Sequence, residues 1–529
     1  MVTVFRRFFF LLICLLYNVQ SENAFCFGKT FFTPEDENRF FLHTVERGQT
    51  VYSISVMYKI PIDSIYKYNP GSKEGIREGS TLNVPQLSGS FHYHTIQPKE
   101  TLYSVSRMYQ MTGEDIVAVN PGLSVQTFTI GKTIRIPVNE VTEPMPVGNE
   151  YVQKHDTEAL LFRQPMGGRM EVVRVALLLP FGLNEDTNET NASTNRFVEY
   201  YEGFLMALER LKNEGVSVDL SVHDIGKSEK ELPAILQKLS LSGVDLLIGG
   251  YTDKQIKLIS QFSKEKSVPY VIPFTSKSDE PMNNPHAFQI NTPQSYLYSK
   301  ASAVFCNAFK GDNIIIYLTN ATDDKAEFVK LLETDLKKNN ESVTVVKAAE
   351  TVAKDVQTLL SAQRLNVIVP SDDSKESLVK LIASLKIFYD THPEYPVSLF
   401  GYPGWQAYAG DYMEDYFKLY LHFYSLFYVD PTVREMKDFQ YQFSRWYSRG
   451  LIETYPKFGV LGYDTGMFFI KGLNEYGAAF EANIKKVKYK GIQTDFQFER
   501  VNNWGGFINT NIYLVTFNPD FTVNKDLYR

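Results

Sequence analysis

The strongest constraint on this chain is a segment that occurs twice. When residues 43–71 are moved forward by 51 positions they align with residues 94–122, and 12 of the 29 positions are identical. After one inserted residue, the match resumes and ends at Pro85 in the first copy and Pro137 in the second. A repeat of this length is a small structural unit that the chain uses twice.

Each copy has the pattern of a strand, two helices and a closing strand. A short extended segment and a polar turn lead to Thr50 or Thr101, which are suited to cap the N-terminus of a helix. Apolar residues then recur at i, i+3 and i+7, which predicts one buried helical stripe. A second short helix is stopped by Asn-Pro-Gly, a strong helix breaker. We therefore expect two βααβ units, at residues 40–86 and 91–138.

This pattern resembles the LysM module, and the resemblance covers both copies. The first copy has Gly-Gln-Thr before its first helix, and both copies have Asn near the end of the second helix and Gly, an apolar residue and Ile/Val-Pro at the closing strand. LysM modules bind glycans that contain N-acetylglucosamine, usually peptidoglycan in exported bacterial proteins. The resemblance implies a shallow sugar groove between two loops, formed by Gly48, Gln49, Thr50, Asn69, Pro70, Gly71 and Ile76 in the first copy and by Thr101, Asn120, Pro121 and Gly122 in the second.

The second copy departs from this pattern at one loop. Lys99-Glu100 stands where the first copy has Gly48-Gln49. Glycine lets a backbone approach a ligand closely, and lysine does so less readily. We expect weaker glycan binding by the second unit.

The N-terminus has the pattern of an export signal. Arg6 and Arg7 precede an apolar run over residues 8–17, and we expect cleavage after about residue 21. A retained anchor is the competing interpretation, but the run is shorter than the ~20 residues that cross a bilayer as a helix. Loss of the two arginines changes the net charge from −7 to −9. The expected location is the periplasm or cell envelope, with no transmembrane span in the mature chain.

The charge of the chain bears on its partners, and its cysteines bear on a disulfide bond. The chain has a formal net charge of −7 and no long Lys/Arg run, which argues against nucleic acid as a partner because phosphate binding needs a concentrated basic face. Outside the signal, Cys26 and Cys306 could pair or remain two separate thiols.

The rest of the chain predicts a linker and then a large α/β domain. Residues 139–170 contain several Pro and Gly and few periodic apolar positions, as linkers do. From residue 171 onward, buried-type strands alternate with amphipathic segments of helical length. Such alternation predicts parallel sheets covered by helices on both faces, and the length indicates two doubly wound lobes. Expected strands include 173–179, 216–223, 244–248, 270–272, 314–318, 343–346 and 367–369.

The order of these segments resembles type I periplasmic-binding proteins, the class that binds branched-chain amino acids. The resemblance covers about 171–525 and includes a crossover at 287–293, a helix opened by 462–465 and a final strand at 512–517. In that family, hydroxyl and backbone N–H groups after the third and fourth strands hold a ligand carboxylate. The resemblance implies a small solute such as an amino acid or peptide, bound by Tyr251, Thr252, Thr275, Ser276 and, from the opposite lobe, Tyr402.

No catalytic, metal or cofactor motif is complete in the sequence. Ser263-Lys264-Glu265-Lys266 fits S-x-x-K without a K-T-G partner, and His92 with His94 lacks a third metal ligand. We therefore predict a non-enzymatic, exported peptidoglycan-binding protein that anchors a solute-binding or sensing domain to the cell wall. One alternative is an envelope scaffold or regulator of cell-wall synthesis that binds an envelope protein and no small molecule, for which the aromatic segment 408–428 is a candidate surface. A cell-wall hydrolase is the third.

Overall fold

The computed structural model describes residues 40–86, 89–138, 150–163, 167–183, 192–319 and 324–528. The predicted signal segment 1–21 and Cys26 lie outside these ranges, and Cys306 is a free thiol. Residues 41–529 form one compact unit. Within the described part of the chain, no helix combines the length and apolar character needed to cross a membrane.

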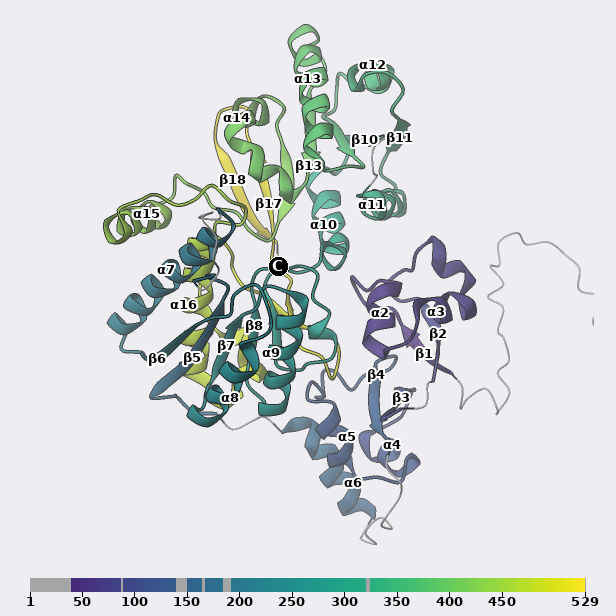
Figure 1. Ribbon diagram of the computed structural model, residues 1–529. Helices are drawn as coiled ribbons and strands as arrows, with labels where there is room; N and C mark the ends of the chain where they lie inside the picture. Colours follow the sequence, from purple (N-terminus) through teal and green to yellow (C-terminus); the bar gives the residue numbers. More distant parts are fainter. Residues whose placement is uncertain are drawn as a thin grey trace, which may run out of the picture. The chain divides into compact units, whose positions relative to one another are not determined.

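The first part of the fold is a pair of small βααβ units (Figure 1). In each unit two strands form a separate sheet, and two short helices lie between the strands in the chain. Thr50 and Thr101 cap the first helix of their units, and each forms a reciprocal capping box with the serine three residues later. The predicted βααβ pattern is confirmed for both copies. The elements are β1 (Phe40–Thr44), α2 (Val51–Tyr58), α3 (Ile62–Tyr68), η1 (Pro70–Glu74), β2 (Thr81–Pro85), β3 (Phe91–Thr95), α4 (Leu102–Met108), α5 (Gly113–Val119) and β4 (Thr133–Pro137).

A helix lies within the segment for which the sequence predicts a linker. Helix α6 (Glu150–Ala159) is followed by η2 (Leu160–Phe162), whose Leu160 and Leu161 complete the apolar core of the second unit. Glu158 accepts a hydrogen bond from the Tyr103 N–H at 2.8 Å. Helix α6 buries no residue of its own, so its sequence lacks the apolar stripe from which a helix is recognised.

The first lobe of the large domain is a seven-stranded sheet with helices on both faces (Figure 1). Its five leading strands are parallel in the order 2-1-3-4-5, a doubly wound arrangement. Alternate residues of the first strand pack against helices on opposite faces of the sheet. The sheet order is β6 (Ser217–Asp224), β5 (Val172–Leu179), β7 (Leu246–Gly249), β8 (Tyr270–Ile272), β9 (Ala287–Gln289), β16 (Phe507–Asn509) and β15 (Phe498–Arg500). The helices are α7 (Ala192–Asn213) and α16 (Phe458–Tyr476) on one face, α8 (Leu232–Ser242) and α9 (Asp253–Lys266) on the other, with η3 (Glu280–Met282), η6 (Gly477–Ala479) and η7 (Glu481–Lys486).

The second lobe repeats the same strand order. Its first five strands are again parallel and run 2-1-3-4-5, and two antiparallel strands extend the sheet. The predicted two-lobed, doubly wound α/β fold is confirmed. The sheet order is β11 (Val343–Lys347), β10 (Asn313–Leu318), β12 (Asn366–Pro370), β13 (Val397–Gly401), β14 (His422–Ser425), β17 (Ile512–Phe517) and β18 (Val523–Tyr528). The helices are α10 (Gln294–Ala308), α11 (Ala326–Lys338), α12 (Val352–Val356), η4 (Gln357–Leu359), α13 (Lys375–Thr391), η5 (Pro403–Tyr408) and α14 (Ala409–Lys418). Helix α15 (Arg434–Tyr447) follows β14 in the chain but packs against α16 and α7 of the first lobe, through Phe439 on Tyr463 and the Tyr447 hydroxyl on the Glu202 carbonyl.

One local prediction is refined and two need correction. The segment 287–293 leads from the first lobe to α10 of the second, as a crossover does, but its first three residues form strand β9. The helix expected to open at 462–465 begins at Phe458 and is buried almost throughout, so its first turn lacks the amphipathic pattern that marks a helix. Strand β17 is not the last, because the half-exposed edge strand β18 follows it.

Candidate functional sites

The first loop of each small unit is held by a buried histidine. In the first unit the Gln49 side-chain oxygen accepts hydrogen bonds from the His43 ring Nε2 at 2.7 Å and from the Glu46 N–H at 2.9 Å. The hydroxyl of Tyr58 donates to His43 Nδ1 at 2.7 Å. Burial lowers the pKa of His43, which favours the neutral ring that this pattern of bonds requires. Gln49 therefore acts mainly as a support for the loop.

The second unit reproduces this arrangement with different residues. Glu100 takes the place of glutamine and accepts from the Gln97 N–H at 2.7 Å and from His94 Nε2 at 2.8 Å. Lys99 adopts the left-handed conformation of its glycine counterpart, with φ of 72° against 76° at Gly48. The Lys99-Glu100 substitution thus leaves the backbone of the loop unchanged. The His94 ring contacts Glu100 through Nε2 and Tyr109 through Nδ1.

The two asparagines predicted for the grooves are structural. The Asn69 amide donates to the Ile65 carbonyl at 2.8 Å and to the Asn83 carbonyl at 2.9 Å. Asn120 is fully buried and makes the equivalent bonds, so its side chain has no surface to offer a sugar. Each asparagine ties the end of the second helix to the closing strand.

The remaining groove residues divide into exposed and covered positions. Pro70, Gly71 and Pro121 are exposed, and Ile76 is half-buried. Gly48 and Gly122 instead face the large domain. A Cβ on Gly48 would lie 2.8 Å from the Tyr296 Cα, and the Gly122 N–H donates to the Asn503 carbonyl at 2.8 Å. One of the two groove loops is therefore covered in each unit.

In the first lobe, the predicted solute residues lie at the carboxyl ends of β7 and β8. Tyr251 is 41 % exposed and packs edge-on against Phe197 of α7, with ring centroids 5.2 Å apart. The Arg196 guanidinium lies over both rings and over Phe458, and it donates to the Tyr251 hydroxyl at 3.3 Å. Among the described residues, its buried Nε has no hydrogen-bond partner. This edge thus combines a cation with an aromatic surface, a setting suited to a carboxylate that carries an apolar group.

The hydroxyl residues at the same edge have local structural partners. Thr252 caps α9 and accepts from the Gln255 N–H. The Thr275 hydroxyl oxygen accepts from the Lys277 N–H at 3.0 Å, whereas Ser276 is half-buried. Phe274 precedes them and stacks on Phe458 at 5.5 Å, which places aromatic rings between these hydroxyls and α16.

Tyr402 of the opposite lobe lies in the core. Its side chain is fully buried, and its hydroxyl donates to the Pro370 carbonyl at 2.5 Å. It also packs against Trp405 and Tyr424. Tyr402 therefore has no exposed atom for a solute, and it lies between the end of β13 and the start of η5.

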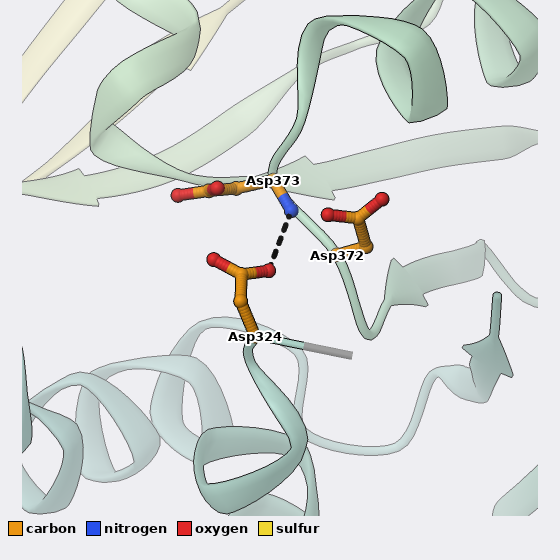
Figure 2. A group of neighbouring side chains, drawn as sticks. All are labelled: Asp324, Asp372 and Asp373. Atoms are coloured by element: carbon orange, nitrogen blue, oxygen red, sulfur yellow. Dashed lines mark hydrogen bonds between the residues drawn. The ribbon is translucent and has the colours of Figure 1, made fainter. Parts of the chain in front are cut away.

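Three carboxylates gather beyond the carboxyl ends of the paired strands β10 and β12 in the second lobe (Figure 2). Ligand atoms of Asp324, Asp372 and Asp373 lie within 4.8 Å of one another. The ammonium of Lys325 is nearly buried and pairs with Asp324 and, at 2.8 Å, with Asp373. The Asp373 N–H also donates to Asp324, the contact drawn in Figure 2. Since this cluster already contains its own cation, we assign no metal ion to it.

The aromatic segment 408–428 belongs largely to the core of the second lobe. Tyr416, Phe423 and Tyr424 are buried, and the Tyr416 hydroxyl donates to the Trp405 carbonyl at 2.9 Å. The rings at 408–428 therefore mostly stabilise the lobe, whereas the apolar side chain of Met413 is 40 % exposed.

Two residues of interest were not found from the sequence. Arg196 lies in an amphipathic helix, where a basic residue carries no signal of its own. Trp504 lies in an Asn/Gly-rich loop, and only the structure shows that it is buried against both small units.

Comparison with known proteins agrees with this division of the chain. The LysM domain model matches residues 43–85 and 94–137, and the model of the receptor family ligand binding region matches residues 200–388. These matches are to domains of a binding type.

Two curated relatives are similar over part of their length. A Bacillus subtilis (strain 168) protein named as a sporulation-specific glycosylase is 30% identical over 97 residues, 18% of this chain and 22% of that protein. A Staphylococcus aureus (strain NCTC 8325 / PS 47) protein named as an autolysin is 28% identical over 118 residues, 20% of this chain and 44% of that protein. The chain therefore spans less than half the length of either relative.

Solved structures of transport proteins also align with the chain. The ABC transporter substrate-binding protein from Desulfitobacterium hafniense, in complex with Leu, is 14% identical, with a TM-score of 0.41 over 67% of this chain and 100% of that one. The fold assignment rests on the two 2-1-3-4-5 sheets and on the domain matches. The chain carries two tandem LysM domains followed by a domain of the type I periplasmic-binding fold.

Proposed function

We propose that this protein is exported to the cell envelope and binds peptidoglycan through its LysM pair, which holds the two-lobed domain at the wall. The observation that supports this most directly is the LysM match to both repeats, together with the βααβ geometry of each. The exposed Pro70-Gly71 loop of the first unit is the accessible part of the groove.

A pull-down on purified sacculi tests this function with the full chain. Gly71 has open space around its Cβ position, and its backbone conformation allows other residues, so Gly71→Gln adds a side chain to the groove without disturbing the core. We expect retention to fall about fivefold, equivalent to roughly 1 kcal/mol. Gly450→Gln is the matched control, since this glycine of the large domain also has open space. Equal retention of both variants would refute binding at this loop, and no retention of the wild type would refute wall binding.

We further propose that the large domain binds a small solute with a carboxylate and an apolar group, at the edge that holds Arg196, Tyr251, Thr252, Thr275 and Ser276. The support is the Arg196 guanidinium beside exposed aromatic surface, with a buried Nε that has no partner within the described part of the chain. Thermal shift against amino acids and short peptides tests this, because a ligand that binds only the folded state raises Tm. Arg196→Met should remove the shift, while Arg434→Met, at an exposed ion pair within α15, should keep it.

A ligand-free scaffold remains the second candidate, favoured by one observation. Phe197, Phe274 and Phe458 pack against one another at the same edge, so part of the space for a solute is filled by the protein's own rings. If no compound raises the Tm of the folded wild type, the scaffold is the better description and a protein of the envelope becomes the expected partner.

A further inference from the structure

The loop that joins β15 to β16 in the large domain inserts between the two LysM units. Trp504 at its centre is 2 % exposed and belongs to the apolar core of the first unit. Its ring lies 5.9 Å from Tyr58 of the first unit and 5.6 Å from Tyr93 of the second. The Arg135 guanidinium of the second unit covers the same ring at 4.6 Å. One side chain of the large domain therefore fills a space to which both units contribute.

Hydrogen bonds fix this loop against the second unit. Asn503 accepts from the Gly122 N–H through its carbonyl and donates through its side chain to the Thr133 carbonyl at 3.1 Å. A Cβ on Gly122 would lie 2.5 Å from the Arg500 Cδ, so the large domain occupies the space directly over this glycine. Arg135 also donates to Asn283 at 2.7 Å.

The first unit is covered from a different direction. Its Gly48 loop lies directly on the Tyr296 backbone at the start of α10, and Arg47 donates to the Ser299 hydroxyl at 3.2 Å. On the neighbouring α2, the Tyr52 hydroxyl donates to Asp279 at 2.7 Å. These contacts reach both lobes, because Asp279 precedes η3 of the first and Ser299 belongs to α10 of the second.

We propose that the large domain is a built-in competitor for glycan, which covers the Gly48 loop of the first LysM groove and the Gly122 loop of the second. This inference rests on the proposed binding of peptidoglycan by those grooves. In the docked state a glycan reaches only the Pro70-Gly71 loop of the first unit and the Lys99–Thr101 loop of the second. Full occupation of either groove requires the LysM pair to separate from the large domain, so tight glycan binding and release of Trp504 occur together.

The test uses full-length variants changed only on the large domain, which leaves every residue of the grooves intact. One variant carries Asp279→Ala and Ser299→Ala, which remove two exposed contacts to the first unit. A second carries Asn503→Ala and Trp504→Ala, and Asn524→Ala on the exposed side of edge strand β18 is the control. Binding of a soluble β-1,4-linked N-acetylglucosamine pentamer is measured by calorimetry, with circular dichroism to confirm folding.

We expect each docking variant to bind the pentamer at least threefold more tightly than the wild type and the control.

Quenching of tryptophan fluorescence by acrylamide tests whether Trp504 is released. Trp446 is 49 % exposed, whereas Trp405 and Trp504 are buried. The exposed Trp446 is therefore replaced by Trp446→Phe, so that an increase in quenching reports exposure of Trp504. Saturating pentamer should increase that quenching. Unchanged or weaker binding by both folded docking variants, or unchanged quenching, would overturn the competition while leaving glycan binding intact. Absence of pentamer and sacculus binding in the wild type and all variants would instead overturn the proposed function.

Discussion

The side chain of Asn120 forms two hydrogen bonds with the backbone of Arg135, one to its N–H and one to its carbonyl, as the backbone of a neighbouring strand would. Its oxygen accepts from the Arg135 N–H at 2.9 Å and its amide donates to the Arg135 carbonyl at 2.7 Å. Asn69 and Asn83 repeat this pairing in the first unit, at 2.8 Å and 2.9 Å. The conserved geometry of the two copies explains why the repeat keeps this residue independently of any ligand.

Asn120→Ala should therefore destabilise the second LysM unit by about 3 kcal/mol, because it leaves buried backbone groups of Arg135 without partners. Urea unfolding measures the change, and Asn524→Ala on the exposed side of β18 serves as control. A loss below about 0.5 kcal/mol, the range of ordinary surface substitutions, would contradict the structural role.

The equivalent positions Lys99 and Gly48 should respond in opposite ways to substitution. Lys99 is exposed and strained at φ of 72°, so Lys99→Gly should stabilise the second unit by about 1 kcal/mol. Gly48→Ala combines positive φ with a Cβ placed 2.8 Å from Tyr296, and should destabilise the protein by at least about 1 kcal/mol. Paired thermal melts measure both changes, and two shifts of the same sign would count against this account of the loops.

The repeat and the two sheets could be predicted because their signals are local. In β5 and β10 nearly every residue is buried, so the apolar runs are unambiguous, and the alternation with helices then fixes the class of fold. Strand β9 and the start of α16 are harder to predict, because β9 is too short to form a pattern and α16 is buried on nearly all sides.

The sites were less predictable because they depend on contacts between distant residues. Thr252 and the two asparagines match family motifs, yet their side chains are used by the fold itself. Trp504 contacts Tyr58 although more than four hundred residues separate them in the chain. The sequence Asn502-Asn503-Trp504-Gly505 contains no pattern that predicts this contact.

Asp464 links helix α16 to the segment that leads to β15. Its buried carboxylate accepts from the Tyr489 hydroxyl at 2.7 Å and from the N–H groups of Ile492, Gln493 and Thr494 at 2.8 to 3.1 Å. Asp464→Asn replaces one acceptor oxygen by a donor that faces other donors. We expect a loss of about 3 kcal/mol in unfolding free energy, measured by urea titration.

Asp526→Asn is the matched control, because Asp526 lies exposed on strand β18. If both variants unfold at the same urea concentration, the carboxylate of Asp464 does not organise residues 489–494.

His422 should make the protein less stable in weak acid. Burial in β14 lowers the pKa of His422 from 6.5 to about 4, although its ring donates to the Tyr420 carbonyl at 2.9 Å. Between pH 6.5 and 4 the unfolded chain therefore binds a proton that the folded chain does not, so the unfolding free energy falls as the pH falls. The total loss from this group is about 3 kcal/mol.

This prediction is measured as the slope of the unfolding free energy against pH, taken at steps of about half a pH unit over that range. The slope reports how many more protons the unfolded chain binds than the folded chain, and His422→Phe should lower that number by about one. His155→Phe, at an exposed position of α6, should leave it unchanged; a wild-type slope retained in His422→Phe would show that other groups carry the acid sensitivity.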